Sequence, residues 1–577
     1  MANLAFSPVA RRRHLPLASG EALILAGLCV YALALSVLPL GRLLLEAFRP
    51  GENGLVFGTF FDVWNSRAAP RALGNTFIAS LGATCISVVV GALAAGIVRL
   101  ADLRGREIIA FLFLLPMLIP PQISALAWIE LTGSTSPILR LVGLAPPPGR
   151  TNPLYSMPGI IWVMGLEHAP LVMLSMLSAL RGIPRDLIDA ARVGGARAGH
   201  ILGRIVLPLA LPGLMAGAAL AFVSAIGNFG VPALLGIPGR VTVLTTLIYQ
   251  RLNGFGPSVL PEVASLALVL VLLAVAGLVL RGLVMGRRGF SVDRTGSELE
   301  PFPTGRWRPI FELAAWMFAL TIAVLPLLAL VSSALVPALG VELSWATLSL
   351  ENFEFVLGGS GMISRAFANS FVLAGAAALA TAAVAMLLGY LVVVRRNPVA
   401  RVIDRIADAP YAVPGTVLAL GVIIVFLPPL PVLGFSIYGS MAIILAAYLA
   451  RFLPLSLRPV IATLETLDPA LDEAGRVVGA GMPRRLVGIA VPLVLPAALA
   501  GGLLVFMTAV NELTLSALLW STGTETLGVV VFFLQYEGNS PAASALASVV
   551  VAVTITMAAL LEFLARRFAP GASLLRG

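Results

Sequence analysis

The stretch "DEAGRVVGAGMPRRLVGIAVPLVLP", from Asp472 to Pro496, places a charged, glycine-containing segment directly before a long apolar run. A second stretch, "DAARVGGARAGHILGRIVLPLALP", has the same organisation and runs from Asp189 to Pro212. In both, a glycine stands six residues after an acid, and nine further residues separate that glycine from an Ile-x-x-Pro segment. Two copies of one spacing in one chain indicate an internal repeat.

The correspondence extends well beyond these two segments. "RALGNTFIASLGAT" around Asn75 matches "RAFANSFVLAGAAA" around Asn369, and "LPMLIPP" at 115–121 matches "APYAVPG" at 409–415. The chain therefore contains a duplicated module. If each copy has an even number of membrane spans, both copies have the same orientation, and the repeat is parallel, with its pseudo-two-fold axis along the membrane normal.

The composition is that of a helical membrane protein. Of 577 residues, 59% are hydrophobic and 11% are charged, with mean hydropathy +0.98, whereas a soluble domain has roughly a quarter charged residues. Many apolar runs reach the ~20 residues that a helix needs to cross a bilayer. The sequence predicts an all-α polytopic membrane protein with about 12 transmembrane helices in two parallel six-helix repeats. The expected spans are 22–46, 75–98, 108–131, 157–180, 206–230 and 260–284, then 312–336, 369–394, 405–428, 438–460, 490–514 and 542–565.

The predicted domain division follows the repeat. The first half covers 1–286, with its core at 73–284, and the second half covers 310–577, with its core at 367–566. The charged segment 287–309 is expected to be a cytoplasmic linker.

All 38 basic residues are arginines, and most fall in segments that are cytoplasmic if the N-terminus is inside, including Arg451 to Arg485. This is the positive-inside pattern, so the net charge of +10 indicates a membrane partner and no nucleic acid. Without lysine, a phosphate-binding P-loop is excluded. Cys29 and Cys85 lie in apolar runs and are expected to be buried, and the three histidines are too scattered for a metal cage. No cofactor or metal site is predicted.

Each polar loop is expected to form a short helix, a glycine break and a second short helix. Small residues after the acid keep one face of the first helix flat. Pro208 and Pro492 are interpreted as the beginning of the next span, since proline is tolerated in a helix's first turn. An acidic, small-sided helix in the cytosol suits docking to a soluble partner. The alternative is an ordinary solvated loop.

The pattern of E-A-A, three residues, Gly, nine residues and I-x-L-P resembles the signature loop of bacterial binding-protein-dependent ABC importer permeases. The resemblance covers 73–284 and 367–566. It implies that the loops are coupling helices contacting an ATPase subunit. Asp189 replaces the usual Glu, and Gly475 replaces the second Ala. The implied contact residues are Asp189, Ala190, Ala191, Gly195, Glu473, Ala474, Gly475 and Gly479.

The resemblance further implies a multi-pass permease subunit of the bacterial inner membrane, without catalytic residues of its own. Its expected partners are two copies of a cytoplasmic ATPase and a periplasmic substrate-binding protein. "FVSAIGNFGVPALLGIPGRVTVLTTLIYQ" at 222–250 and "NELTLSALL" near Asn511 are similar to ferric-iron importer permeases. Permeases for thiamine and aminoethylphosphonate share the fused architecture, so these cargoes stay open.

Asn228, Asn511 and Glu512 are candidates to line a translocation path, because polar residues inside a membrane indicate function. They are expected near the outer end of the fifth span of each half, where placement at the membrane interface is the alternative. Adjacent helix positions such as Glu167 and His168 point about 100° apart, so this pair is interpreted as serving packing or helix ends. An ion-driven secondary transporter is the main rival, but it leaves the paired loops unexplained. A membrane enzyme lacks any catalytic cluster.

Overall fold

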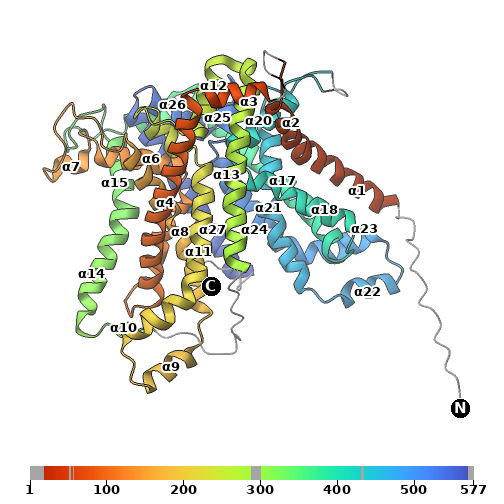
Figure 1. The fold of residues 1–577 in the computed structure, drawn as a ribbon, viewed down its shortest axis with the longest axis horizontal. Helices are drawn as coiled ribbons and strands as arrows, with labels where there is room; N and C mark the ends of the chain where they lie inside the picture. The colour runs from red at the N-terminus through yellow and green to blue at the C-terminus, as the bar shows by residue number, and fades with distance from the viewer. Residues whose placement is uncertain (1–18, 51–53, 56, 287–300, 431–433, 569–577) are drawn as a thin grey trace.

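The computed structural model describes residues 19–50, 54–55, 57–286, 301–430 and 434–568. Within these ranges the chain is helical, and an isolated β-bridge joins Ala101 to Phe302. Ten helices are long and apolar enough to cross a membrane, and two further helix pairs qualify only as bent pairs (Figure 1). The predicted all-α polytopic fold is confirmed.

The two halves contain matching sets of membrane helices. In the first half these are α1 (Ser19–Ala32) continuing through η1 (Leu33–Val37) into α2 (Leu38–Ala47), then α4 (Ala68–Arg99), α5 (Arg106–Leu118), α6 (Pro121–Thr132), α8 (Met157–Arg181), α11 (Leu207–Gly227) and α13 (Leu260–Gly286). In the second half they are α14 (Arg308–Ala319) continuing through η6 (Leu320–Val324) into α15 (Leu325–Ala334), then α17 (Gly361–Val393), α18 (Pro398–Ala407), α19 (Ala409–Ala412), α20 (Gly415–Phe426), α21 (Met441–Thr466), α24 (Val491–Val510) and α27 (Ser540–Phe568).

The third span of each half, expected at 108–131 and 405–428, is a bent pair of helices rather than one continuous helix. The chain turns by 107° between α5 and α6 and by 113° between α19 and α20. Pro120 and Pro121 lie at the first break, and Pro414 at the second. Proline lacks a backbone N–H and disfavours the helical conformation of the residue before it, which accounts for both breaks.

Small residues form the helix contacts, and many large apolar residues face outward. A Cβ built on Gly91 of α4 would lie 2.5 Å from the carbonyl oxygen of Ala169 in α8, so only glycine permits this approach. On the same helix Phe77 is exposed. Lipid is as apolar as a protein core, so apolar side chains gain little from burial in a membrane protein. Cys29 and Cys85 are exposed, and their expected burial was wrong for this reason.

The first span of each half packs on the broken helix of the other half. α2 lies against α20, where a Cβ on Gly421 would lie 2.6 Å from the carbonyl oxygen of Pro39. The Tyr31 hydroxyl of α1 donates to the carbonyl oxygen of Leu449 at 2.6 Å. In the mirrored arrangement α15 packs on α6, and the Ser333 hydroxyl donates to the Glu130 carboxylate at 2.6 Å.

Ionic contacts attach the first span of each half, here called the crossing span, to the other half at the end of the span nearer the polar loops. Arg395 donates to Glu21 at 2.8 Å, and Arg308 lies 3.3 Å from Asp102. Arg395 and Asp102 occupy corresponding short loops, each between the second span and the broken span of its half. The crossing spans are therefore held at equivalent places, with the signs of the charges exchanged.

Replacing Gly421 with leucine is expected to separate α2 from α20. No side chain fits beside the Pro39 carbonyl, and overpacking a close contact costs about 1–3 kcal/mol. Thermal unfolding of the protein in nanodiscs measures the effect. Gly375→Leu is the matched control, because a Cβ at Gly375 of α17 would meet no atom within 4 Å. Equal melting temperatures for the two variants would contradict the close packing.

Apart from the crossing spans, the halves meet on the side opposite the polar loops, here called the outer side. The short helices α12 (Leu244–Phe255), α25 (Ser516–Leu519) and α26 (Leu527–Tyr536) gather there, along the upper edge of Figure 1. α26 packs on α6, and α12 packs on α20 and α25. The short helices α9 (Arg185–Val193) and α22 (Ala470–Val477) of the two polar loops lie apart, at the lower left and lower right of the bundle (Figure 1). Outside the crossing spans, the halves thus meet at the outer side, while their polar-loop helices lie apart.

Candidate coupling and translocation sites

The two polar loops adopt the predicted helix–glycine–helix form. α9 (Arg185–Val193) is followed by α10 (Ala198–Ile201), and α22 (Ala470–Val477) by α23 (Met482–Arg485). Gly195 and Gly479 have φ of +78° and +77°. This left-handed conformation ends a helix at little cost only for glycine. Each motif therefore needs glycine at this position, because the backbone there is left-handed.

An apolar stripe is exposed on each of these helices. On α9 it consists of Leu187, Ala190 and Val193, and on α22 it consists of Leu471, Ala474 and Val477. Val193 is 90% exposed and Val477 is 87% exposed. The residues recur every three positions and so share one helix face. Both polar-loop helices thus expose apolar side chains along one face.

The other predicted contact residues surround the stripes. Gly195, Glu473 and Gly479 are exposed, Asp189 and Ala191 are half-buried, and Gly475 is buried. The two acids have different surroundings, because Asp189 accepts from Arg185 at 3.2 Å and from Arg192 at 3.3 Å within its own helix.

A buried ion pair explains the glycine that replaces the second alanine. A Cβ on Gly475 would lie 2.9 Å from Cδ of Arg485. Arg485, only 5% exposed, donates to Asp472 at 2.5 Å, and the Tyr390 hydroxyl donates to the same carboxylate at 2.9 Å. The corresponding positions in the first half are Ile188 and Ile201, both buried in one apolar cluster. One loop is thus held by charge and the other by aliphatic packing.

The end of the linker reaches the first loop. The guanidinium of Arg192 lies 5.5 Å from the ring centre of Phe302, and the Phe302 N–H donates to the carbonyl oxygen of Leu100 at 2.7 Å. The remainder of the predicted linker, 287–300, lies outside the described residues.

A π-helical turn connects each loop to its next span. η2 (Leu202–Val206) precedes Pro208, and η8 (Leu486–Ala490) precedes Pro492. The spans run continuously over Ala198–Gly227 and Met482–Val510, so the prolines do not begin them, and that expectation was wrong. The wider turn relieves the clash between each proline ring and the preceding carbonyl groups.

Asn228 lies at the end of the fifth span and contacts the middle of the fourth span. It follows the last residue of α11, and its amide donates to both carboxylate oxygens of Glu167, at 3.0 and 3.2 Å. Glu167 lies near the midpoint of α8. The fifth span therefore ends beside the middle of α8.

Glu167 and His168 also approach each other more closely than expected. His168 Nε2 lies 3.9 Å from Glu167 Oε1, while His168 Nδ1 bonds the carbonyl oxygen of Met164 at 2.6 Å. The argument that adjacent side chains diverge does not hold here.

Arg451 is the functional candidate that sequence reasoning missed. It was assigned to a cytoplasmic segment, but it lies inside α21 and donates to the carbonyl oxygen of Val413 at 3.0 Å. Its guanidinium also interacts electrostatically with Glu512, whose carboxylate accepts from the Leu515 N–H at 2.8 Å. Extending the repeat register would have found it, because Arg451 corresponds to Glu167 just as Glu512 corresponds to Asn228.

Each half's break touches the other half's fifth span. The Gln122 side chain, beside the first break, donates to the carbonyl oxygen of Asn511 at 3.2 Å. In return, a Cβ on Gly227 would lie 3.6 Å from Pro414 at the second break. Gly227 and Asn511 are equivalent in the repeat. These contacts join a set of side chains that we call the polar row: Glu167, Asn228, Gln122, Asn511, Glu512 and Arg451.

Aromatic side chains from both halves also pack together where the halves meet beside the polar row, a region here called the junction. The ring centre of Phe229 lies 5.1 Å from that of Tyr249 and 6.3 Å from that of Phe532 in the second half. Phe229 and Phe532 are almost fully buried. Burial raises the pKa of Tyr249 to about 12, so its hydroxyl stays protonated at physiological pH.

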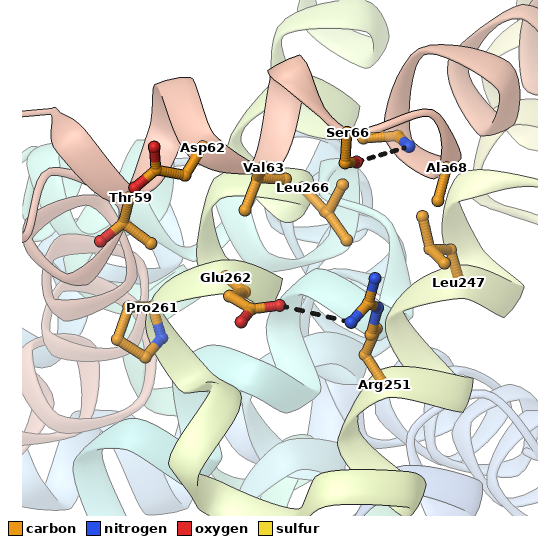
Figure 2. Close-up of a pocket in the computed structure, with 11 residues that line it drawn as sticks. Thr59, Asp62, Val63, Ser66, Ala68, Leu247, Arg251, Pro261, Glu262 and Leu266 are labelled. Atoms are coloured by element: carbon orange, nitrogen blue, oxygen red, sulfur yellow. Dashed lines mark hydrogen bonds and ion pairs between the residues drawn. The ribbon is translucent and has the colours of Figure 1, made fainter. Parts of the chain in front are cut away.

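A separate cavity of about 550 Å³ lies beside α3 (Gly58–Asn65), α12 and the beginning of α13 (Figure 2). Arg251 and Glu262 face each other across it, with Nη1 and Oε2 3.7 Å apart, and Asp62 stands at its rim. All its lining residues belong to the first half, so the cavity is not part of the junction between halves.

Comparison with known families gives two matches within the chain. Residues 87–285 and 381–573 each match the family described as the binding-protein-dependent transport system inner membrane component. The two matches coincide with the repeat, and each contains one of the polar loops.

Curated relatives match over most of the chain. A probable ABC transporter permease of Sinorhizobium fredii is 26% identical over 496 residues, covering 84% of this chain and 85% of the relative. A ferric transport system permease of Actinobacillus pleuropneumoniae is 25% identical over 529 residues, covering 90% and 73%. A putative 2-aminoethylphosphonate transport system permease of Salmonella typhimurium is 29% identical over 217 residues, covering 37% and 75%.

Among solved structures, the chain is similar to a bacterial alginate ABC transporter in complex with a periplasmic protein bound to an alginate pentasaccharide. The TM-score is 0.37 with 20% identity, over 46% of this chain and 91% of that one.

Proposed function

Because the chain belongs to the family of binding-protein-dependent transport system inner membrane components, we propose that it carries ferric iron through an importer driven by two copies of a separate ATPase subunit. The chain is a multi-pass inner-membrane permease of the ABC type. In the proposal, α9 and α22 dock on the ATPase subunits, and a periplasmic binding protein delivers the cargo to the outer side.

The single observation that carries the docking proposal is the pair of exposed apolar stripes. They have the same residue types at the same spacing on two helices that lie on one side of the membrane. A two-fold ATPase dimer presents two equal surfaces, and one fused chain with two equal helices satisfies that symmetry. Recognition of such helices by a hydrophobic groove is a common binding mode.

The structure supplies a mechanical route from the docking helices to the junction. Each docking helix continues through η2 or η8 into α11 or α24, and the far ends of these spans contribute Asn228 and Asn511 to the polar row. The halves meet at the outer side, so we assign this arrangement to the inward-facing state. Closure of the ATPase dimer would draw the docking helices together and part the junction. Because coupling is reciprocal, a loaded binding protein outside would stimulate ATP hydrolysis inside.

The choice of ferric iron is supported by the relatives that span most of the chain, several of which are ferric transport permeases. Aminoethylphosphonate is the second candidate, because the Salmonella relative has a slightly higher identity over its shorter match.

The test is ATP hydrolysis by the reconstituted complex of permease, ATPase and binding protein, titrated with Fe³⁺, thiamine and aminoethylphosphonate. We expect several-fold stimulation with Fe³⁺-loaded binding protein and none with the unloaded form. Stimulation by another cargo would replace iron while keeping the importer mechanism. Failure to associate with any ATPase, with uptake driven by an ion gradient instead, would overturn the mechanism itself.

A further inference from the structure

We propose that Glu167, together with His168, is the specificity-determining contact of the translocation path and that it selects a cationic cargo. This inference rests on the proposed function, because it concerns what passes between the halves of the importer. It also goes further, since it assigns the sign of the cargo's charge from the chain's own residues.

Glu167 lies one hydrogen bond away from the junction of the halves. Its carboxylate accepts from the Asn228 amide, and the neighbouring Gly227 lies against Pro414 of the second half. Beyond Pro414, a Cβ on Gly415 would lie 3.4 Å from Nη1 of Arg451. Glu167 and Arg451 thus occupy equivalent places on the two sides of one contact, where a cargo passing between the halves would meet both.

The charges in the polar row are not balanced in the same way on the two sides. In the second half, Arg451 interacts electrostatically with Glu512 and donates to the carbonyl oxygen of Val413. In the first half, Glu167 accepts from a neutral amide, and its printed ion-pair contact among the described residues is the His168 imidazole at 3.9 Å, which is charged only when protonated. An embedded carboxylate whose partners are an amide and an imidazole is a functional-site candidate by default. A cation entering the junction would supply a permanent counter-charge.

His168 adds a second acceptor. Its Nδ1 lies 2.6 Å from the Met164 carbonyl oxygen, and a carbonyl only accepts, so Nδ1 carries the hydrogen. In the neutral ring the lone pair of Nε2 is then directed outward, and Nε2 is 3.9 Å from Glu167 Oε1. Two ligand atoms that each lie about 2.0–2.2 Å from one ion stand up to about 4 Å apart. Because one nitrogen and one carboxylate are only two ligands, they would hold a cation loosely, which suits its passage rather than its retention.

A purely structural role for Glu167 is separable from this one. If Glu167 only links α8 to α11, any side chain that accepts a hydrogen bond from the Asn228 amide can replace it. Glutamine keeps that acceptor and removes the charge. Glu167→Gln therefore preserves the hydrogen bond between α8 and Asn228 and tests the charge alone.

The experiment measures cargo uptake and ATP hydrolysis together in proteoliposomes that contain the whole complex. With Glu167→Gln, we expect uptake of Fe³⁺ from its binding protein to fall at least tenfold. Glu167→Asp should recover part of the uptake, and a control variant outside the polar row should leave both uptake and stimulated ATP hydrolysis within about twofold of the unmodified complex. Glu130→Gln is the matched control, because Glu130 is also a buried acid with a neutral donor, Ser333, but lies outside the polar row.

The unmodified complex gives an independent result that needs no variant. Selection of a cation requires Fe³⁺ or thiamine, and not aminoethylphosphonate, to be transported. Transport of aminoethylphosphonate alone, or undiminished uptake by Glu167→Gln, would overturn the inference while leaving the importer mechanism intact. If no loaded binding protein stimulates hydrolysis even in the unmodified complex, the proposed function itself fails.

Discussion

Replacing Val193 and Val477 together with aspartate is expected to detach the ATPase subunits and lower cargo-stimulated ATP hydrolysis at least about 100-fold. Each substitution places an unpaired carboxylate in an apolar groove of the partner. Burying an unpaired polar group costs about 1–3 kcal/mol and a charge costs more, and each 1.4 kcal/mol lowers affinity tenfold. Both valines are almost fully exposed in the permease, so the fold itself loses no contact.

Co-purification of the ATPase with the permease measures this prediction directly. Trp345→Asp is the control, because Trp345 is 96% exposed but lies on the connection between α15 and α17, away from both stripes. If the double variant binds ATPase as tightly as the control does, α9 and α22 are not the docking helices.

The second prediction concerns the ion pair beneath α22. Asp472→Ile alone is expected to destabilise the protein by about 3–5 kcal/mol, because it leaves the buried Arg485 without its carboxylate. The double variant Asp472→Ile with Arg485→Ile is expected to regain most of that stability. It copies Ile188 and Ile201, the apolar pair that the first half has at these positions.

The apparent melting temperatures of the single and double variants in nanodiscs provide the comparison. A double variant as unstable as the single one would show that the charge itself, and not the filling of the space, holds α22 in place. In that case the two loop helices would be held in place by different kinds of interaction, one ionic and one apolar.

The sequence was sufficient for features that depend on local pattern. Apolar runs predict the membrane helices, because a helix that satisfies its own backbone is required in lipid. The glycines at 195 and 479 predict the loop geometry, because their conformation is a property of a single residue. The repeat predicts that both loops lie on one side of the membrane.

Features that depend on contacts between distant segments were not predicted. Arginines near apolar runs ordinarily mark the cytoplasmic side, yet Arg451 is inside a span, where it donates to the carbonyl oxygen of Val413. The breaks were visible as prolines in "LPMLIPP" and "APYAVPG". Their angles could not be read from the sequence, since a proline kink in a membrane helix ranges from slight to complete.

Departures from the family pattern were also visible without being explained. Gly475 stands where the pattern has alanine, and the reason is the Arg485 side chain against its backbone, ten residues further along the chain. Substitutions of this kind become interpretable once the neighbouring helix is placed.

The crossing first spans have a consequence for how the protein is made. The Tyr31 hydroxyl bonds a carbonyl group 418 residues away, and α2 rests on a helix that begins at Gly415. While the ribosome is still producing the second half, the first span is already in the bilayer without its eventual neighbour. The first span cannot complete its packing until that helix has been inserted. The last stage of biogenesis is therefore the packing of each first span against the other half. Because both halves belong to one polypeptide, the second half is always synthesised next to the first.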